Sequence, residues 1–340
     1  MTERLRVQEE EAWNAFVQNH PRGTFFHLTG WKNVLEGSLH HRAHYLTARR
    51  GGSIAGVLPL IEIKSRFFGH ALLSTAFCVA GGPLSIDADS EIELLSAATS
   101  IARELNVDYV ELKDTPGAPE GWLARQDLYA GFERPISADE ATCLTQIPRK
   151  QRAVVRKSLT SGLTFTLDND VSAVFDLYAR TVRDHGTPVF PKALFQSLKD
   201  NFGQACEILT VRKDGMPISS VMSFYYRDRV LPYYTGSLPS ARDTGANDLM
   251  YWRLMRRASE RGCAIFDFGR SKTGTGPYAF KKNWGFPARP IPHQFFLNRL
   301  KVLPNLNPTN PKFHLLVRMW QRLPLSVANV LGPFISRNLG

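Results

Sequence analysis

The chain repeats itself once, and this repeat limits the folds that are open to it. Leu46-Thr-Ala-Arg-Arg-Gly-Gly in the first half is matched by Leu209-Thr-Val-Arg-Lys-Asp-Gly in the second, and an apolar run follows each segment. Both segments predict a strand, a tight turn at Gly52 or Gly215, and a returning strand. The repeat length of roughly 160 residues is far above the ~20–50 residues of solenoid repeats. The sequence therefore predicts a duplicated domain.

The two halves then continue in the same order. Residues 92–106 and 246–262 each have the apolar spacing of a long helix, and each leads into a short apolar run typical of a strand. Glu111 and Asp267 take equivalent positions in these two strands. Hairpins mixed with helices predict an α+β fold with a mixed sheet, because a doubly wound parallel sheet needs strict alternation of strand and helix.

Four segments follow from this organisation. They are an N-terminal domain at 1–140, a basic linker helix at 141–162, a C-terminal domain at 163–302 that carries the candidate site, and a basic tail at 303–340. In the tail, Phe313, Leu316, Val317 and Trp320 share one face of a predicted helix. Such a basic amphipathic helix either packs on its own domain or lies on an anionic membrane surface.

Composition narrows the class of protein. The chain has 340 residues, of which 43% are hydrophobic and 21% charged, enough for two cores and too few charges for a disordered chain. The four cysteines form no CxxC pair, and we expect reduced thiols and neither disulfides nor a zinc site. An acidic N-terminus argues against a secretory signal, and the longest apolar run is too interrupted to span a bilayer. We expect a cytoplasmic protein that can attach peripherally to the inner face of the plasma membrane.

The charge is distributed unevenly. Asp267 is the last acidic residue, and the Lys and Arg residues after it account for the whole net charge of +11. A second basic cluster lies between Arg149 and Lys157. Two such clusters on an otherwise neutral chain predict an anionic partner, which would be phosphates, RNA or a membrane surface. A solvated basic face is the alternative for either cluster.

The candidate site lies between Cys263 and Phe286. An apolar strand ends on Asp267, a Gly- and Ser/Thr-rich loop follows, and a lysine pair then stands among aromatic residues. A carboxylate at a strand end, a loop and paired cations suit an anionic ligand. The loop has Thr275 where a P-loop needs lysine, so it is not a nucleotide-binding P-loop. No histidine cluster has a Cys or carboxylate at metal spacing, so no metal is expected.

The order and the amino-acid sequences of these segments resemble those of the Fem-type (FemAB-like) acyltransferases. The motifs that carry the resemblance are RKQRAVVRKSLTSGL, PYYTGS, NDLMYWRLM and FDFGRS…FKKNWGF. The resemblance implies two tandem domains of the GNAT N-acetyltransferase fold. GTPVFP and the tail RLPLSVANVLGPFISR resemble a branch found with bacterial exopolysaccharide and exosortase (PEP-CTERM) systems.

The resemblance implies transfer of an acyl or aminoacyl group to an amine on a cell-envelope or exopolysaccharide precursor. It implies no firm cofactor; acyl-CoA and aminoacyl-tRNA are the two candidate donors, and both carry phosphates. The chain lacks the Q/R-x-x-G-x-G/A acetyl-CoA loop of simple GNAT enzymes and the helical hairpin that contacts tRNA in some Fem enzymes. The donor therefore stays open, with tRNA the less supported partner.

Nine side chains are candidates for this chemistry: Asp267, Tyr234 and His185 as catalytic residues, and Arg270, Ser271, Lys272, Lys281, Lys282 and Tyr233 as substrate-binding residues. The attacking amine needs a carboxylate to orient it and accept its proton, and Asp267 is the candidate. The alternative is that Asp267 caps the turn through Gly269.

The other candidates have alternatives too. Arg270 and Lys272 are expected to hold phosphate, with Ser271 as a hydrogen-bond donor. Lys281 and Lys282 match the FK…G motif of the family, which is associated with the phosphates of the precursor, and one of the pair is expected to be solvated.

Tyr233 and Tyr234 point to opposite faces of a strand, so one is expected in the core and the other can donate to the oxyanion. His185 is either a base or a surface residue. In the first half, Lys113 and Asp114 are not followed by a Gly-rich loop, and we expect a structural or acceptor-shaping role there.

A second hypothesis of another class also fits. A catalytically inactive GNAT-like binding protein could dock exopolysaccharide machinery at the membrane through its basic tail. We favour the enzyme, because the side chains at the strand end and in the loop are chemically suited to transfer.

Overall fold

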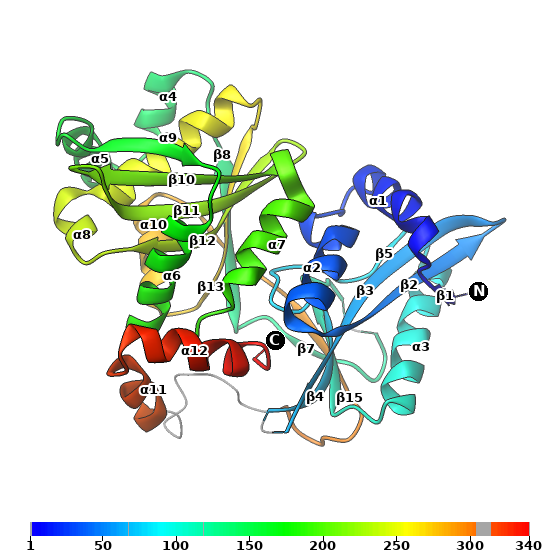
Figure 1. The fold of residues 1–340 in the computed structure, drawn as a ribbon. Coiled ribbons are helices and arrows are strands. Elements are labelled where there is room, and N and C mark those ends of the chain that lie inside the picture. The colour runs from blue at the N-terminus through cyan, green and yellow to red at the C-terminus, as the bar shows by residue number, and fades with distance from the viewer. Residues whose placement is uncertain (1, 67, 118, 304–313, 340) are drawn as a thin grey trace. The chain divides into compact units, whose positions relative to one another are not determined.

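The computed structural model describes residues 2–66, 68–117, 119–303 and 314–339, which form two compact units (Figure 1). The first unit consists of residues 2–128, 291–303 and 337–339, and the second of residues 129–290 and 314–336. Within the described ranges, no helix is long and apolar enough to cross a membrane.

The first unit is built on one mixed sheet in the order β1-β2-β3-β4-β6-β15-β7, and β5 pairs with β3 outside this path. Its strands are β1 (Thr2–Arg4), β2 (Arg42–Arg50), β3 (Ser53–Ser65), β4 (Gly69–Ser74), β5 (Leu84–Ser85), β6 (Tyr109–Lys113), β7 (Leu123–Arg125) and β15 (His293–Leu297). Its helices are α1 (Glu10–Asn19), α2 (Thr29–Leu39) and α3 (Ala88–Glu104).

The second unit repeats this plan in the order β9-β10-β11-β12-β13-β8-β14. Its strands are β8 (Tyr129–Pro135), β9 (Thr164–Asp168), β10 (Cys206–Lys213), β11 (Met216–Tyr226), β12 (Arg229–Ser237), β13 (Ile265–Lys272) and β14 (Ala288–Pro290). Its helices are α4 (Glu140–Thr145), α5 (Arg149–Leu159), α6 (Ser172–Asp184), α7 (Lys192–Phe202), α8 (Ser240–Thr244), α9 (Ala246–Glu260), α10 (Gly276–Asn283), α11 (His314–Gln321) and α12 (Leu325–Ser336).

The predicted duplication is confirmed by these matching sheets and by their hairpins. Two-residue loops, Gly51–Gly52 and Asp214–Gly215, join β2 to β3 and β10 to β11. All four loop residues have positive φ angles, which suits the tight turns that match the twist of paired strands. In both sheets the fourth and fifth strands, β4–β6 and β12–β13, are parallel. Glu111 and Asp267 lie on the fifth strand of their sheets, as the repeat predicted.

Each half of the chain gives one strand to the sheet of the other half. Strand β8, N-terminal to the expected boundary at residue 140, pairs with β13 in the second sheet. Strand β15, within the expected range 163–302, pairs with β6 in the first sheet. The units therefore divide the chain differently from the expected segments at these two strands. Alternating apolar residues mark a strand but do not select its partner, which is set by contacts distant in the sequence.

The expected linker helix at 141–162 is two helices. Pro148 precedes α5, and proline disfavours a helical conformation in the residue before it. Helix α4 therefore ends before the proline, and α5 starts directly after it. The exposed face of α5 carries Arg149, Lys150, Arg156 and Lys157.

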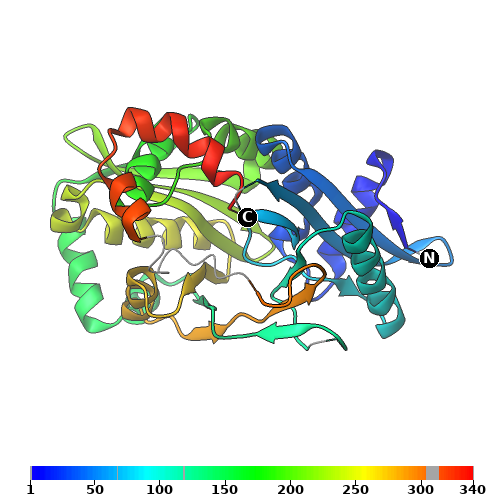
Figure 2. The same cartoon turned by 90° about the horizontal axis from the view of Figure 1, so that it is seen from below.

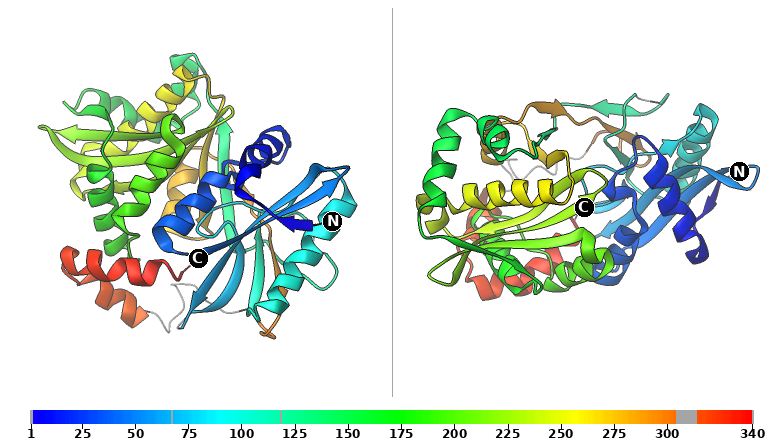
Figure 3. Two further views of the ribbon diagram at one scale, coloured as in Figure 1. Left: turned by 45° about the vertical axis from the view of Figure 1, so that its right-hand side comes forward. Right: turned by 90° about the horizontal axis from the view of Figure 1, so that it is seen from above.

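Helices cover both faces of the second sheet (Figure 3). Helix α6 packs on β11 and β12, and α9 packs on β10, β11 and β12 from the other side. Trp252 of α9 is fully buried, as is Phe195 of α7. Gly236 of β12 allows α6 to approach closely, because a Cβ atom there would lie 2.1 Å from the backbone nitrogen of Tyr178.

The C-terminal helices α11 and α12 pack beside α6 (Figure 2). Val317 lies against Gly186, and Gly332 lies against Val189. The predicted packing face of the tail helix is partly wrong, because Leu316 is 60% exposed. Phe313, the first residue of that face, lies outside the described residues.

Candidate functional site

The two parallel strands in the centre of the second sheet pair over a very short distance. β12 and β13 pair through two residue pairs, Arg229 with Ile265 and Val230 with Phe266. β13 instead follows β8 as far as Lys272. Beyond Phe266, the backbone N–H and C=O groups on the facing edges of β12 and β13 do not pair with each other and need other hydrogen-bond partners. We call the segments 232–237 of β12 and 267–272 of β13 the β12–β13 divergence.

A β-bulge lies on β13 at the start of this divergence. Its register with β8 shifts between Asp267 and Arg270, and Gly269 adopts a positive φ of 65°. The Asp267 carboxylate accepts a hydrogen bond from the Gly269 backbone nitrogen at 2.8 Å. The Lys281 ammonium group, from the last turn of α10, donates to the carbonyl oxygens of Phe268 at 2.6 Å and Arg270 at 2.9 Å. A carboxylate and an ammonium group therefore hold the bulge together.

Burial perturbs both of these groups. It raises the pKa of Asp267, and Glu133 on the neighbouring β8 adds to this effect, while the Gly269 hydrogen bond, Arg229 and Lys281 oppose it. Burial lowers the pKa of Lys281 to about 8, with Asp267 opposing the change. An acid with a raised pKa and a base with a lowered pKa are typical of sites that transfer protons near neutral pH.

Tyr251 of α9 connects the two diverging strands. Its ring packs on Phe268 of β13 with ring centroids 4.8 Å apart, and its hydroxyl donates to Thr235 Oγ1 of β12 at 3.4 Å. Burial raises the pKa of Tyr251 to about 12, so the hydroxyl keeps its proton at neutral pH. The sequence analysis did not select this residue, because a tyrosine within the apolar pattern of a long helix looks like a core residue.

Further polar side chains of α9 lie next to Tyr251. Asn247, one turn earlier, accepts from Ser219 Oγ at 2.7 Å and donates to Ser237 Oγ at 3.4 Å. Asp248 accepts from Gln151 of α5, and burial raises the pKa of this carboxyl. The spacing of Asn247 and Tyr251 at i and i+4 was the available sequence signal for a polar face toward β12.

The predicted phosphate-binding residues on β13 point to opposite faces of the sheet. Arg270 lies over the ring of Tyr129, 4.3 Å from its centroid, and Lys272 is half-buried, with a pKa lowered by burial and by Arg270. Ser271 is buried on the opposite face of β13, so the structure does not bring its hydroxyl together with these cations. Lys282 is exposed beside Tyr278, whereas its neighbour Lys281 is bound to the bulge.

The other three predicted residues lie on β12 and at the end of α6. Tyr234 is buried in an aromatic cluster under α6 and α7, with Phe195 at 4.9 Å and Tyr178 at 5.5 Å between ring centroids. Tyr233 is half-buried against Phe224. His185 is exposed at the C-terminal end of α6, and within the described ranges it has no hydrogen bond or ring contact with Asp267.

The equivalent place in the first unit is closed. β4 and β6 pair up to Leu73↔Glu111, and the backbone nitrogen of Lys113 then donates to Ser74 Oγ at 2.8 Å. The buried Lys113 side chain donates to the Thr75 carbonyl at 3.4 Å. Glu111 is paired with His293 of β15 at 2.6 Å. These contacts engage Glu111 and Lys113 within the first unit. The structural or acceptor-shaping role of the first domain stays a prediction.

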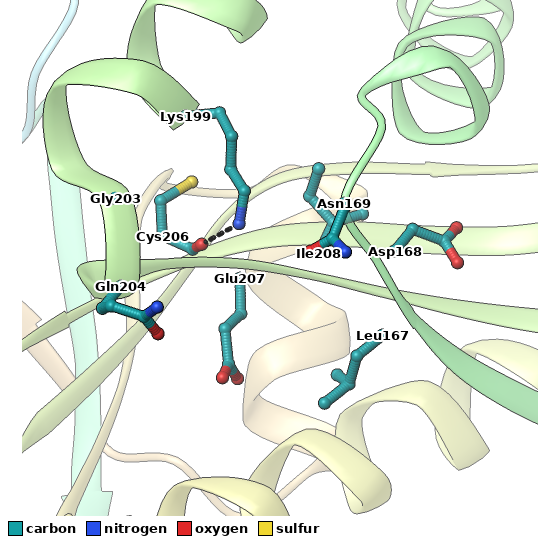
Figure 4. Close-up of a pocket in the computed structure, with 9 residues that line it drawn as sticks. All are labelled: Leu167, Asp168, Asn169, Lys199, Gly203, Gln204, Cys206, Glu207 and Ile208. Atoms are coloured by element: carbon teal, nitrogen blue, oxygen red, sulfur yellow. Dashed lines mark hydrogen bonds between the residues drawn. The ribbon is translucent and has the colours of Figure 1, made fainter.

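A pocket lies elsewhere in the second unit, between β9, β10 and the end of α7 (Figure 4). It is lined by Leu167, Asp168, Asn169, Lys199, Gly203, Gln204, Cys206, Glu207 and Ile208. Its charged groups are already engaged. Glu207 accepts from Arg257 and Arg261, and Lys199 donates to the carbonyl of Cys206. This pocket therefore offers little charge to a ligand.

Within the described ranges, no group of three or more His, Cys, Asp or Glu residues could hold a metal ion. All four cysteines are buried free thiols. Proton transfer and hydrogen bonding are the chemistry that the residues of the divergence offer.

Comparison with known proteins identifies the fold. Residues 144–282, which include the β12–β13 divergence, match the family model described as an acetyltransferase (GNAT) domain. The second unit therefore contains a domain of the GNAT fold. No curated protein sequence matches the chain.

Solved structures extend the likeness to the whole chain. FemX is 16% identical, with 88% of this chain and 98% of FemX covered and a TM-score of 0.68. L-PGS from Bacillus licheniformis is 15% identical, with 94% and 99% covered and a TM-score of 0.55. A tandem GNAT protein from the clavulanic acid biosynthesis pathway is 13% identical, with 86% and 97% covered and a TM-score of 0.53. At these identities the likeness concerns the fold, and it shows two tandem GNAT-fold domains, as the sequence predicted.

Proposed function

We propose that this chain is an N-acyltransferase or aminoacyltransferase whose active site is the β12–β13 divergence of the second GNAT domain. The observation that carries the proposal is the separation of two parallel central strands after two residue pairs, with Asp267, Lys281 and Tyr251 at the separation. The match of residues 144–282 to an acetyltransferase domain supports the same location. The first unit, in which this position is closed, is then a structural partner.

The proposed chemistry uses the perturbed groups in distinct roles. A neutral amine attacks the acyl carbon of the donor, a new C–N bond forms, and the bond from that carbon to the leaving sulfur or oxygen breaks. Asp267 takes the proton from the amine, because its raised pKa makes it a better base than an ordinary carboxylate. Tyr251, which stays protonated, donates its hydroxyl proton to the leaving group and regains a proton from solvent.

Lys281 has a supporting role in this scheme. Its ammonium group holds the carbonyl groups of Phe268 and Arg270 and so fixes the bulge that positions Asp267. Positive charge beside the developing oxyanion also stabilises the transition state. Substitution of Asp267 or Lys281 is therefore expected to change the fold of the bulge as well as the chemistry.

The donor and acceptor are proposed from chemistry and resemblance. AcCoA is named with the tandem GNAT protein of the clavulanic acid pathway, and a coenzyme A thioester is our first candidate donor. Aminoacyl-tRNA is the second. Arg270 and Lys272 would hold donor phosphates, and the exposed Lys282 would hold the phosphates of the precursor that carries the acceptor amine. The Fem-type resemblance points to an amine on an envelope or exopolysaccharide precursor as acceptor.

The test is a transfer assay read by mass spectrometry. Purified chain is offered coenzyme A thioesters and charged tRNAs as donors, and UDP-amino sugars and peptide amines as acceptors. Tyr251→Phe is the most informative variant, because it removes one hydroxyl and leaves the bulge intact. Its transfer rate is expected to fall about 100-fold, within the range of general acid catalysis.

Tyr225→Phe is the matched control. Its hydroxyl also makes a hydrogen bond, to Glu207 of β10 at 2.9 Å, and Tyr225 lies on β11, outside the two segments of the divergence. Transfer by Tyr225→Phe at the wild-type rate together with a slow Tyr251→Phe variant supports the proposal. Equal rates for wild type and Tyr251→Phe would remove Tyr251 from the site. No transfer with any donor would favour the catalytically inactive binding protein.

A further inference from the structure

Helix α12 presents an apolar stripe to solvent. Val327, Val330, Leu331 and Phe334 are spaced at i, i+3, i+4 and i+7, and their exposure ranges from 40% at Val327 to 67% at Phe334. This spacing normally marks the face that a helix buries. Here the stripe stays at the surface of the second unit.

The inner face of α12 explains this inversion. Its buried residues are small, namely Ala328, Gly332 and Ser336. A Cβ atom at Gly332 would lie 2.8 Å from Val189, so the helix backbone lies directly on the 186–191 loop. The large side chains of α12 consequently point outward. Single exposed apolar residues are common, but a contiguous stripe indicates an interaction surface.

Helix α11, which precedes α12 in the chain, has an exposed face that carries positive charge. Leu315, Arg318 and Met319 share one exposed face of α11, and Arg322, directly after the helix, is exposed too. No acidic residue follows Asp267 in the chain. The acidic side chain next to α11 is Asp184, whose carbonyl oxygen accepts from Gln321 and whose carboxylate is paired with Arg183 at 2.7 Å. The exposed face of α11 is therefore both apolar and cationic.

We propose that α11 and α12 form a docking surface for an anionic lipid bilayer. We call it the α11–α12 surface. It is made of Leu315, Arg318 and Met319 of α11, of Arg322 directly after α11, and of Val327, Val330, Leu331 and Phe334 of α12. Apolar side chains that insert at the headgroup boundary and arginines that meet lipid phosphates are the two contributions that hold a helix in a membrane interface. A second copy of the chain would bring like charges together, which disfavours self-association.

The proposal concerns a different surface from the transfer site and does not depend on catalysis. Attachment through α11 and α12 would hold the second GNAT domain at the membrane surface. The test therefore measures membrane binding and not turnover.

The experiment is vesicle flotation of the full chain. Vesicles of phosphatidylcholine alone are compared with vesicles that contain about 30 mol% phosphatidylglycerol, at roughly 0.05 M and 0.5 M salt. We expect binding to the anionic vesicles that weakens steeply at the higher salt concentration. Absence of binding to anionic vesicles would overturn the proposal.

Two paired substitutions separate the apolar and charged contributions. Val330→Gln with Phe334→Gln is expected to weaken binding at least about tenfold at both salt concentrations. Arg318→Gln with Arg322→Gln is expected to weaken it about fivefold per arginine at low salt and little at high salt. The melting temperature of each variant shows that it is folded.

Matched controls use the same chemistry elsewhere in the second unit. Met216→Gln removes an apolar side chain that is 68% exposed, and Arg149→Gln with Arg156→Gln removes charge from α5. Both controls should bind like wild type. Equal losses in the controls, or unchanged binding by the α11–α12 variants, would overturn the assignment. Light scattering that shows a dimer split by the Val330 and Phe334 changes, without loss of vesicle binding, would make this a self-association surface instead.

Discussion

Lys281 gives a prediction that can be worked through from the structure. Its ammonium group is buried against the bulge of β13, and burial lowers its pKa from 10.5 to about 8. In the unfolded chain the same lysine has an ordinary pKa near 10.4. Between about pH 8 and pH 10.4 the unfolded state therefore binds more protons than the folded state.

The sign of the effect follows from this difference. Where the unfolded state binds more protons, the free energy of unfolding rises with pH. A shift of about 2.5 pKa units corresponds to roughly 3 kcal/mol of added stability across the window. Below pH 8 both states hold the proton, and the contribution of Lys281 no longer changes. The neutral amine still has two N–H groups for the carbonyls of Phe268 and Arg270.

The assay is urea unfolding of wild type and Lys281→Met at a series of pH values from 7 to 10.5. The quantity of interest is the difference in the free energy of unfolding, because other titrating groups affect both proteins equally. We expect the difference to grow by roughly 3 kcal/mol in favour of wild type as the pH rises. Lys282→Met, which changes an exposed neighbour, is the control for the loss of a lysine from α10. A difference between wild type and Lys281→Met that stays constant with pH would refute the burial of this charge.

Three further predictions concern stability. Gly236→Ala should lower the free energy of unfolding by more than about 2 kcal/mol, because its Cβ would meet the Tyr178 backbone. Gly276→Ala has open space around its Cβ and should change the free energy of unfolding by less than about 0.5 kcal/mol. Chemical denaturation of the two variants measures both values. Burial lowers the pKa of His27 to about 4, so stability should fall by roughly 3 kcal/mol as the pH drops from 6.5 to 4, and His27→Gln should lack this acid dependence. Glu207→Gln should lower the free energy of unfolding by about 1–3 kcal/mol, because Tyr225, Arg257 and Arg261 lose a charged hydrogen-bond acceptor. A urea-unfolding midpoint equal to that of wild type would contradict this role of Glu207.

Local features of the sequence were sufficient to predict that the chain contains two copies of one domain. The Gly51–Gly52 and Asp214–Gly215 turns are chemically suited to positive φ angles, and this made both hairpins predictable. The long helix of each half followed from its apolar spacing. The exchange of β8 and β15 between sheets was not predictable in this way, because strand pairing over more than 100 residues leaves no local signal.

The candidate site was predictable only in part. The strand that carries Asp267 and the lysine pair after it could be read from their motif, but β13 continues past Asp267 to Lys272, whereas the sequence analysis ended the strand at Asp267. The Asp267 carboxylate accepts from Gly269, as one of its two alternatives had it, and its catalytic role stays a prediction. The sequence left open which of Tyr233 and Tyr234 belongs to the core, and the structure buries Tyr234 among the rings of α6 and α7. Tyr251 was missed because its role depends on the separation of two strands that only the fold reveals.

The most direct test of the proposed site is hydrogen–deuterium exchange of the chain with and without donor, using acetyl-CoA and a charged tRNA as probes. A donor bound at the β12–β13 divergence should slow exchange of the backbone amides in 233–237 and 267–272, which no longer pair with each other. The equivalent segments of the first unit should not change. Protection in the first unit, or slower exchange confined to residues outside the divergence, would contradict the location of acyl transfer proposed for this chain.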